Sequence, residues 1–297
     1  MVIKKLNKSG RVAAKILISL TLVFAFTFLY AFQTAAASSK VFDGFGNNAA
    51  KVNVRMNGRA VLEDEAAIIN SVTYVPLRRF AELCDAESIE WNSQSKTATV
   101  QKGIMIAKIS DKKNYIEANG RYFYLSQPVK NINGRLFVPI RALALLFSLD
   151  VEWNASSRTV ELTSTHTPFI VGKKYYNEND LYWLSRIISA EASGEVLLGK
   201  IAVGNVVLNR VRSKSYPNTI YGVIFDRKYG TQFSPVAIGT IYKEPTAESV
   251  IAAKICLEGF SLSDSILYFM NPRIATNNWI SKTRPFAFRI GNHDFYK

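Results

Sequence analysis

The chain has 297 residues and a formal net charge of +14, from 37 Lys and Arg against 23 Asp and Glu. This length predicts about two domains. The positive charge favours an anionic partner, but the sequence has no dense stripe of Lys and Arg with interleaved aromatic residues, which argues against a nucleic-acid-binding protein. The two cysteines and two histidines do not cluster, so neither a metal site nor a cofactor is predicted.

Residues 1–37 have the layout of a secretory signal peptide. Five basic residues precede a mainly apolar run over 16–32, and small residues follow it. We predict cleavage near Ala37 and a secreted, wall-associated or spore-associated protein. A retained N-terminal membrane anchor is the alternative, although the run is slightly short for a spanning helix. Cleavage would leave 32 − 23 = +9, a charge suited to an anionic bacterial wall polymer, and export also argues against DNA as the partner.

Residues 48–163 contain an internal repeat. The sequence Tyr-Val-Pro-Leu-Arg at 74–78 recurs as Phe-Val-Pro-Ile-Arg at 137–141, and Glu-Trp-Asn at 90–92 recurs at 152–154. Each copy predicts a short strand, a helix opened by proline and a two-stranded hairpin. The two α+β copies are expected to pack against each other, because one copy alone cannot bury its apolar face.

Local signals within the repeat refine this interpretation. Three Asn-Gly pairs, at 57–58, 119–120 and 133–134, predict additional hairpin turns. Trp91 and Trp153 are candidate platforms for a ligand. A tryptophan beside a strand is more often part of the core, however, so we predict core positions for both.

The doubled Val-Pro-Leu/Ile-Arg and Glu-Trp-Asn signatures resemble the copper amine oxidase N-terminal domain. Despite that name, no cluster of histidines or thiols here could hold copper. The resemblance implies an attachment or positioning role, so the expected partner of this module is the cell wall or another protein. The Ser/Thr-rich start of residues 164–174 predicts a linker, in which His166 is expected to be solvated.

Residues 175–297 form the second predicted domain, and its first helix places one carboxyl group on an apolar face. Asn177 is a candidate N-cap. The apolar residues of this helix recur at spacings of three and four, namely Leu181, Leu184 and Ile188. The next step of the stripe is Glu191, whose loss of hydration would raise its pKa toward the range of a general acid. Glu195, a like-charged neighbour four residues on, would act in the same direction. The alternative is an ordinary solvated glutamate at a helix end.

The remaining pattern predicts helices over 198–211 and 247–258, a glycine-punctuated aromatic segment over 229–235 and a terminal strand over 286–290. Cys256 lies inside the third helix and Cys84 inside a helix of the first domain, so no disulfide between them is predicted. Helices with a few short strands make a small α+β domain.

Several segments of this domain, in order, resemble the SleB/CwlJ-type cell wall hydrolases, the spore cortex-lytic enzymes. They are 189–195 (Ser-Ala-Glu-Ala-Ser-Gly-Glu), 201–211, 216–220, 232–237, 268–272 and 289–293. The resemblance implies a compact lysozyme-like α+β fold that acts on peptidoglycan glycan strands, and it makes Glu191 the expected catalytic residue. Ile238 departs from the family pattern, which usually has Asp or Asn there, and this puts substrate preference in doubt.

The number of available carboxylates suggests the reaction type. Glycoside hydrolysis normally uses two carboxylates that flank the bond. Glu195 lies a turn away on the same predicted helix and cannot readily flank a sugar, and Asp226 and Glu244 qualify only if the fold brings them close. We therefore predict lytic transglycosylation by Glu191 between muramic acid and N-acetylglucosamine, with a 1,6-anhydro product that the resemblance also implies.

Supporting roles are assigned by side-chain chemistry. The predicted substrate-binding residues are polar groups for sugar hydroxyls and aromatic rings for stacking, namely Gln232, Ser234, Asn271, Tyr268 and Trp279. The alternative is that these residues only make turns or core. Glu195 is expected to orient the first helix or tune Glu191, and His293 is expected to be structural.

The sequence thus favours an exported peptidoglycan-degrading enzyme that acts on the spore cortex in germination. Vegetative wall turnover is an alternative role for the same domain. A non-catalytic wall-binding protein, in which Ile238 marks lost chemistry, is the competing class. A peptide- or amide-cleaving enzyme would need metal ligands or a thiol dyad, which the sequence does not offer.

Overall fold

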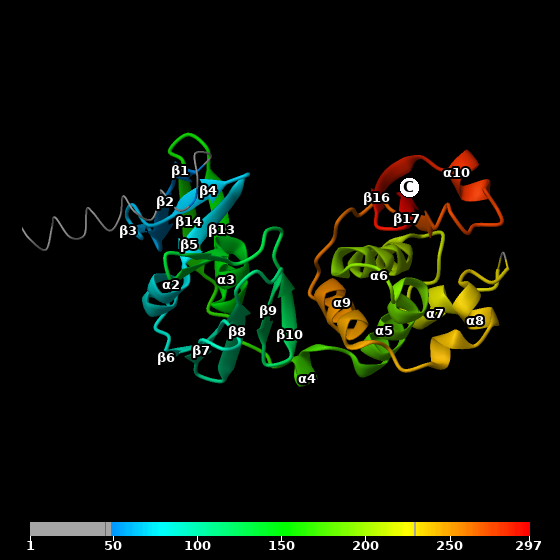
Figure 1. Cartoon of the computed structure of the whole chain (residues 1–297), viewed down its shortest axis with the longest axis horizontal. Helices are drawn as coiled ribbons and strands as arrows, with labels where there is room; N and C mark the ends of the chain where they lie inside the picture. Colours follow the sequence, from blue (N-terminus) through cyan, green and yellow to red (C-terminus); the bar gives the residue numbers. More distant parts are fainter. Residues whose placement is uncertain (1–44, 46–48, 229) are drawn as a thin grey trace, which may run out of the picture.

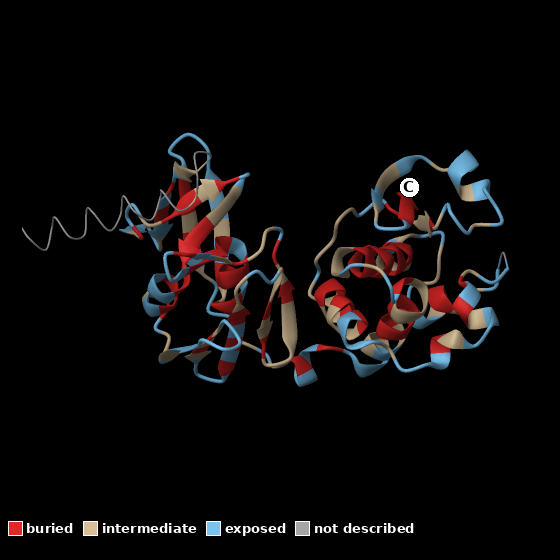
Figure 2. Cartoon of the chain, viewed as in Figure 1, coloured by how far each residue is buried: buried red, intermediate tan, exposed pale blue. Residues whose placement is uncertain are grey.

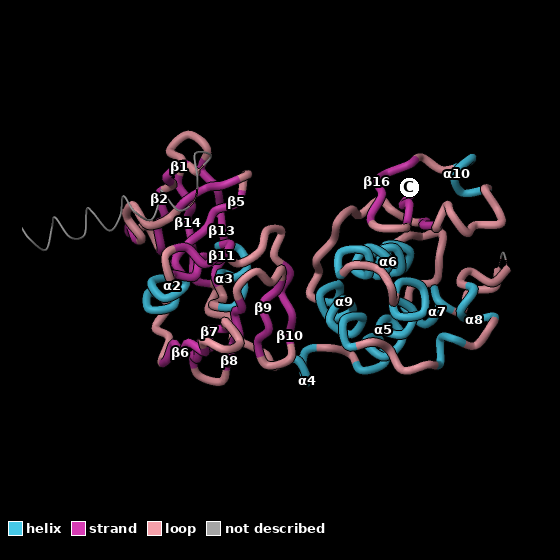
Figure 3. Tube along the Cα trace, viewed as in Figure 1, coloured by secondary structure: helices cyan, strands magenta, loops and turns pink. Residues whose placement is uncertain are grey.

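The computed structural model describes residues 45, 49–228 and 230–297 (Figure 1). The predicted signal peptide over 1–37 lies outside the described residues. Within the described part, none of the helices is both long and apolar enough to span a bilayer. A strand-rich N-terminal domain and a helix-rich C-terminal domain lie side by side, as the colours of Figure 3 show.

The two sequence repeats meet in a central five-stranded sheet of the N-terminal domain. Its strand order is β1 (Ala50–Lys51), β4 (Ala67–Ile69), β5 (Val72–Pro76), β12 (Arg135–Pro139) and β11 (Lys130–Ile132). Strands β5 and β12 are the equivalent Val-Pro strands of the two copies, and they pair antiparallel with Val75 opposite Val138. The expected packing of one copy on the other is therefore confirmed.

Each repeat has the predicted order of strand, helix and hairpin. Helix α2 (Leu77–Leu83) begins after Pro76, and α3 (Ile140–Leu146) begins after Pro139. The hairpins that follow are β6 (Ser88–Asn92) with β7 (Thr97–Lys102), and β13 (Leu149–Asn154) with β14 (Thr159–Ser164). Proline fixes φ near its helical value and lacks an N–H, so it suits the start of a helix.

The two hairpins join different sheets. Strands β6 and β7 continue into β8 (Met105–Ser110), β9 (Tyr115–Ala118) and β10 (Arg121–Tyr124). Strand β14 instead pairs in parallel with β2 (Asn53–Met56), which pairs with β3 (Arg59–Val61). The three Asn-Gly pairs have positive φ at both residues and turn hairpins, as predicted.

The prediction that Trp91 and Trp153 belong to the core is wrong. Their exposed fractions are 46% and 42%. Strands β6 and β13 are the last strands of their sheets, and both tryptophans lie near the ends of these strands. The core is filled instead by other residues such as Phe80 and Leu143. Figure 2 draws the buried segments in red.

Three helices form the core of the C-terminal domain: α5 (Glu178–Ala192), α6 (Leu197–Arg212) and α9 (Ala247–Leu257). They confirm the helices predicted from periodicity. Short helices surround them, namely α4 (Gly172–Tyr175), α7 (Ile220–Ile224), α8 (Ser234–Ala237), η1 (Thr240–Tyr242) and α10 (Trp279–Thr283). Thr246 caps α9 by accepting a hydrogen bond from the Ser249 N–H at 3.2 Å.

A three-stranded sheet closes this domain and confirms its α+β class. Strand β17 (His293–Tyr296) lies between β15 (Tyr268–Met270) and the predicted terminal strand, β16 (Phe286–Ile290). Strand β17 was not predicted. Cys84 and Cys256 are both buried and unpaired, in agreement with the sequence analysis.

The domains are joined by contacts between β10 and α9, which face each other in Figure 1. Arg121 donates from Nε and Nη2 to the Glu258 carboxylate, at 2.8 and 2.7 Å. The Tyr176 hydroxyl donates to the same carboxylate at 2.5 Å. Tyr124 and Phe260 add an aromatic contact with ring centroids 4.3 Å apart. A buried ion pair therefore fixes one domain against the other.

Candidate active site

Glu191 lies in the last turn of α5, where it continues the apolar stripe. Leu184 and Ile188 of that stripe are fully buried, and Glu191 itself is half-buried. Asn177 caps the helix by accepting a hydrogen bond from the Asp180 N–H at 3.1 Å. The predicted placement of one acid on the core side of this helix is therefore confirmed.

The surroundings of Glu191 favour the protonated acid. Burial raises its pKa to about 7, and the nearby positive charge of Arg210 limits that rise. None of the described residues donates a hydrogen bond to its carboxyl group, so the ionised form lacks the usual stabilisation. A carboxyl group with a pKa near neutrality can hold a proton and deliver it to a substrate.

Arg210, on α6, is the positive group that the sequence analysis did not single out. Its guanidinium lies over the rings of Tyr216 and Tyr268, at 5.1 and 5.6 Å, and its Nε donates to the Leu267 carbonyl at 2.8 Å. Burial lowers the pKa of Arg210, but a guanidinium remains charged in proteins. The buried Nη1 has no hydrogen-bond partner among the described residues. The feature of the sequence that could have identified Arg210 is the presence of a basic residue within the mainly apolar segment 201–211.

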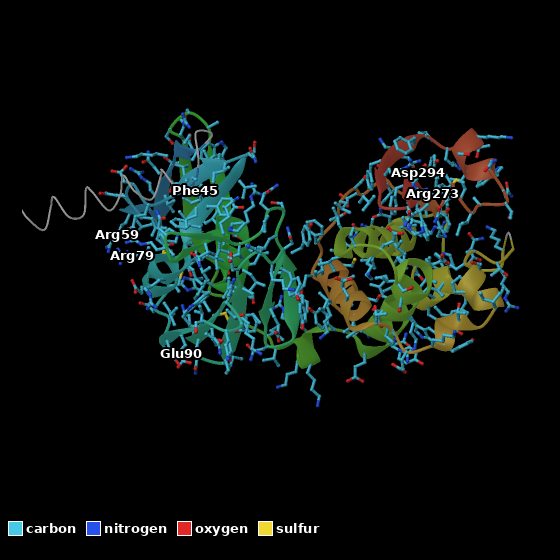
Figure 4. The ribbon with its side chains drawn as sticks, in the orientation of Figure 1. Phe45, Arg59, Arg79, Glu90, Arg273 and Asp294 are labelled. Atoms are coloured by element: carbon cyan, nitrogen blue, oxygen red, sulfur yellow. The ribbon has the colours of Figure 1, made fainter. Side chains whose placement is uncertain are left out.

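Glu191 opens into a cleft of about 600 Å³, within the size range of ligand sites. Its walls come from α5, α8, η1, β15 with the loop after it, and the start of β17. Its polar and charged lining residues are Arg186, Ser189, Glu191, Ser193, Ser234, Thr240, Lys243, Glu244, Asn271 and His293. Figure 4 labels two residues of the C-terminal domain that are adjacent in sequence to this lining: Arg273, before Ile274, and Asp294, after His293.

The fold brings two of the five predicted substrate-binding residues to this cleft. Ser234 and Asn271 line it together with Glu191. Gln232 instead donates to the Gly230 carbonyl at 3.2 Å. Tyr268 and Trp279 lie outside the lining, with ring centroids 6.0 Å apart. The rings of Tyr268 and Trp279 share the Arg284 guanidinium, at 4.7 and 5.0 Å, so they form a neighbouring cluster.

Glu195 is not on the same helix as Glu191, so that prediction is wrong. Helix α5 ends at Ala192, and Glu195 lies in the turn before α6. Its carboxylate accepts hydrogen bonds from the Asn292 backbone N–H at 3.1 Å and from the Asn292 side-chain amide at 2.9 Å. The expectation that Glu195 raises the pKa of Glu191 is also not met, since burial is the cause.

The Glu195 carboxylate is held in its ionised form. Burial alone would raise its pKa, but the hydrogen bonds from Asn292 and the positive field of His293 and Lys200 bring the pKa below its usual value. His293 Nδ1 lies 3.7 Å from Glu195 Oε1, and burial is the main cause that lowers the pKa of His293. Glu195 therefore positions the start of β17, which contributes His293 to the cleft.

A second carboxylate does reach the cleft. Glu244 lines it, pairs with Arg186 at 2.5 Å and has a side chain that is 86% exposed. Asp226 is not among the lining residues, and it accepts a hydrogen bond from the Lys228 N–H instead. Ile238 forms part of the lining with 71% of its surface exposed. The position that departs from the family pattern thus borders the same cleft as Glu191.

Two known families match separate parts of the chain. The family described as cell wall hydrolase matches residues 194–296, a range that begins just after Glu191. The copper amine oxidase N-terminal domain matches residues 55–162.

Curated relatives match the C-terminal part. The spore cortex-lytic enzyme of Bacillus cereus is 40% identical over 122 residues, which cover 41% of this chain and 46% of the relative. That of Bacillus subtilis (strain 168) is 38% identical over 120 residues, which cover 40% and 38%. The chain thus spans less than half the length of these curated relatives.

A solved relative matches the same part. The catalytic domain of the germination-specific lytic transglycosylase SleB from Bacillus anthracis is 40% identical, with a TM-score of 0.38, and the match covers 41% of this chain and 97% of that one. By its C-terminal domain the chain belongs to the cell wall hydrolase family, and a copper amine oxidase N-terminal domain precedes that domain.

Proposed function

We propose that the chain is a peptidoglycan-degrading enzyme that uses Glu191 to cleave the glycan strand between muramic acid and N-acetylglucosamine. The observation that carries this proposal is a half-buried carboxyl group in the cleft wall, with a pKa of about 7 and no hydrogen-bond donor among the described residues. The names of the relatives support it, because they are spore cortex-lytic enzymes and a lytic transglycosylase. The spore cortex is accordingly the proposed substrate, and germination is the proposed stage at which the enzyme acts.

The proposed reaction begins with the Glu191 proton. Glu191 protonates the glycosidic oxygen while the bond from that oxygen to C1 of muramic acid breaks, and the N-acetylglucosamine side leaves with a free hydroxyl group. Positive charge develops at C1, and the new Glu191 carboxylate is stabilised by the Arg210 guanidinium.

The second step restores the acid. The muramic 6-hydroxyl oxygen forms a bond to C1 and passes its proton to the Glu191 carboxylate. The product is a 1,6-anhydro ring, no water is consumed, and Glu191 is protonated for the next cycle. One carboxyl group is sufficient for this sequence of steps.

Hydrolysis is the second candidate, and the position of Glu244 favours it. A carboxylate in the same cleft could activate water against C1, as in two-carboxylate glycosidases. The products would then be reducing ends instead of anhydro ends. The ion pair of Glu244 with Arg186 weighs against a role as base, because it stabilises the charged carboxylate.

The location and the N-terminal module complete the proposal. We infer that residues 1–37 direct export and that the enzyme acts at the spore or the cell wall. The N-terminal domain is proposed to hold the enzyme to its polymeric substrate.

The decisive experiment uses purified chain, Glu191→Gln and Glu244→Gln with cortex and vegetative peptidoglycan, followed by mass analysis of released muropeptides. We expect anhydro-ended fragments from the wild type. Glu191→Gln should lower the rate by a factor of about 10² or more, because it removes the acid. Glu244→Gln should still form anhydro ends.

Each other outcome has a definite meaning. Reducing ends that both substitutions abolish would establish hydrolysis with Glu244 as the second carboxylate. Full activity of Glu191→Gln would refute the assignment of the acid. No release by the wild type from either substrate would favour a wall-binding protein, with Ile238→Asn as the variant to test for regained activity.

A further inference from the structure

The N-terminal domain contains a second, smaller pocket, which we call the Trp91 pocket. It has a volume of about 280 Å³. Its principal lining residues are Leu77, Arg78, Glu90, Trp91, Arg135 and Leu136. Helix α2 and strand β6 come from the first repeat, whereas Arg135 and Leu136 come from strand β12 of the second. The pocket therefore exists only because the two repeats pack together.

Two cations of this pocket lack partners. Arg79, also in the lining, is engaged by Glu65 at 3.4 Å and by Glu82 at 3.2 Å. The side chains of Arg78 and Arg135, by contrast, form neither a hydrogen bond nor an ion pair with any described residue. A guanidinium presents several N–H donors in one plane, which suits a carboxylate or phosphate group. The pocket thus offers two free sites for an anion.

The same pocket offers an aromatic surface. Trp91 is 46% exposed, and the pocket behind it has an apolar wall that includes the buried Leu77 and Leu136. Small-ligand sites combine an apolar or aromatic wall with a few polar groups that fix orientation. Glu90, an exposed carboxylate in the lining, can accept hydrogen bonds from hydroxyl groups.

The second repeat shows that this chemistry is not a requirement of the fold. Its tryptophan, Trp153, is exposed to a similar degree, but the pocket beside it is lined by Glu152 and Glu161 and by no cation. Where the second repeat has Arg135, the first has Val72 at the equivalent position of its strand. The lining beside the two tryptophans therefore differs: it includes arginines at Trp91 and only carboxylates as charged groups at Trp153.

We propose that the Trp91 pocket binds an anionic sugar unit, with the pyranose ring against Trp91 and its acidic group between Arg78 and Arg135. Muramic acid that carries no peptide stem, so that its lactyl group ends in a free carboxylate, is the proposed natural source, and this choice of source rests on the proposed function. Figure 4 labels Arg79 and Glu90 on the side of the N-terminal domain away from the C-terminal domain. The pocket would therefore hold a sugar other than the one in the catalytic cleft.

The test follows the indole N–H signals of the four tryptophans by NMR while sugars are added to the full chain. The chain carries Glu191→Gln, so that no sugar is consumed. We expect N-acetylmuramic acid to shift the signal that disappears in Trp91→Ala. N-acetylglucosamine, which lacks the carboxylate, should bind about tenfold more weakly or worse, as expected for the loss of a charged contact.

Matched variants separate the pocket from other sites. Arg135→Val installs the residue of the other repeat and should remove the preference for the acidic sugar. Trp153 and Arg141 are the residues of the second repeat that correspond to Trp91 and Arg78. Trp153→Ala and Arg141→Gln should therefore leave the dissociation constant unchanged within about twofold, which is less than the effect of one hydrogen bond. If Trp91→Ala lowers the melting temperature, its loss of binding could come from unfolding. In that case the preference for the acidic sugar is judged from Arg135→Val alone.

The outcomes are distinct. Tighter binding of N-acetylglucosamine 6-phosphate, lost in Arg135→Val, would support the pocket and assign a phosphate-bearing sugar as its source. No shift of the Trp91 signal with any acidic sugar, or loss of that shift in Trp153→Ala, would overturn the proposal. Because the readout is binding at the N-terminal domain, an inactive catalytic domain would refute the proposed function without affecting this result.

Discussion

Glu191 and Glu195 are four positions apart, yet their carboxyl groups have opposite environments. Glu191 accepts no hydrogen bond from a described residue, and burial raises its pKa to about 7. Glu195 is buried too, but it accepts two hydrogen bonds from Asn292, and its pKa is lowered. Their surroundings move the two pKa values apart, which supports the proposed role of Glu191 as proton donor and leaves Glu195 as an ionised hydrogen-bond acceptor.

The raised pKa of Glu191 implies that this residue destabilises the fold at neutral pH. In the unfolded chain the group ionises near 4.5, whereas in the folded chain it ionises near 7. The cost therefore grows as the pH rises from 4.5 to 7 and is complete above 7. Glu191→Gln is expected to raise the free energy of unfolding by up to about 3 kcal/mol at pH 8 and by little at pH 4. Urea unfolding at the two pH values measures this difference.

Glu195→Gln is the matched control, and its sign should be opposite. The substitution weakens a charge-assisted hydrogen bond and turns an acceptor into a donor that faces Asn292, so the variant should lose about 1–2 kcal/mol at pH 8. Since the pKa of Glu195 is lowered in the fold, this loss should shrink as the pH falls through that pKa. A Glu191→Gln variant that is less stable than the wild type at both pH values would contradict the interpretation of Glu191.

Sequence periodicity located Glu191 but not its partners. The stripe that contains Leu184 and Ile188 is a local pattern, and local patterns can be recognised from the sequence alone. Arg210 reaches Glu191 from another helix, and Glu244 reaches the cleft from the segment after η1. These contacts depend on tertiary packing, which cannot be predicted from the spacing of residues along the chain. Glu195 was misplaced because the helix ends at Ala192, before the Ser-Gly pair.

At the scale of elements, the hairpin of β16 and β17 depends on one glycine. Gly291, in its turn, has a φ of +56°, and a Cβ atom there would lie 1.9 Å from Glu195 Oε2. Both the backbone conformation and the close approach exclude a side chain. The hairpin can therefore reach Glu195, and His293 can reach the cleft, only with glycine at this turn.

Gly291→Ala should cost about 2 kcal/mol or more in unfolding free energy, because backbone strain adds to a steric clash. It should also lower activity, since β17 positions His293 in the cleft. Gly259→Ala is the control: its φ is +91° but no atom lies within 4 Å of the new Cβ, so strain alone should cost about 1 kcal/mol. Denaturant unfolding and wall-degradation assays test both variants. Equal losses in the two would show that the contact with Glu195 is unimportant.

The elements themselves were largely predictable. Helices α5, α6 and α9 have apolar residues at helical spacing together with capping residues, and the Val-Pro strands and hairpins of the repeat have recognisable turn chemistry. Strand β17 was missed because the strand pattern over 286–290 seemed to end the fold, and its four residues give little periodicity. Trp91 and Trp153 were misjudged because exposure depends on which strand lies at a sheet edge, a property of the whole sheet.

At the scale of the molecule, Glu258 connects the domains. Its side chain is 6% exposed, and it binds Arg121 of the N-terminal domain and Tyr176 after the linker. The sequence does not indicate this pair, because residues 121 and 258 belong to segments with no common motif. Because of this contact, we expect the two domains to unfold as one cooperative unit.

Glu258→Gln is expected to uncouple them. Removing one member of a buried ion pair leaves Arg121 without its counter-charge, a loss of about 3–5 kcal/mol. Calorimetry should show the unfolding transition of the wild type broaden or split into two. Lys51→Gln is the control, since its pair with Asp64 is exposed and should contribute less than about 1 kcal/mol. A single unchanged transition in Glu258→Gln would show that the domains are coupled by other contacts.

The antiparallel pairing of β5 with β12 has a consequence for how the N-terminal domain can be divided. Each repeat supplies one central strand, so a protein cut between the copies would present the edge of that strand, with unpaired N–H and C=O groups, to solvent. We therefore expect that neither half folds by itself, although each contains a full copy of the motif. The shared sheet thus requires both copies of the repeat in one chain. The residues that line the surface pockets are not under this constraint and differ between the copies.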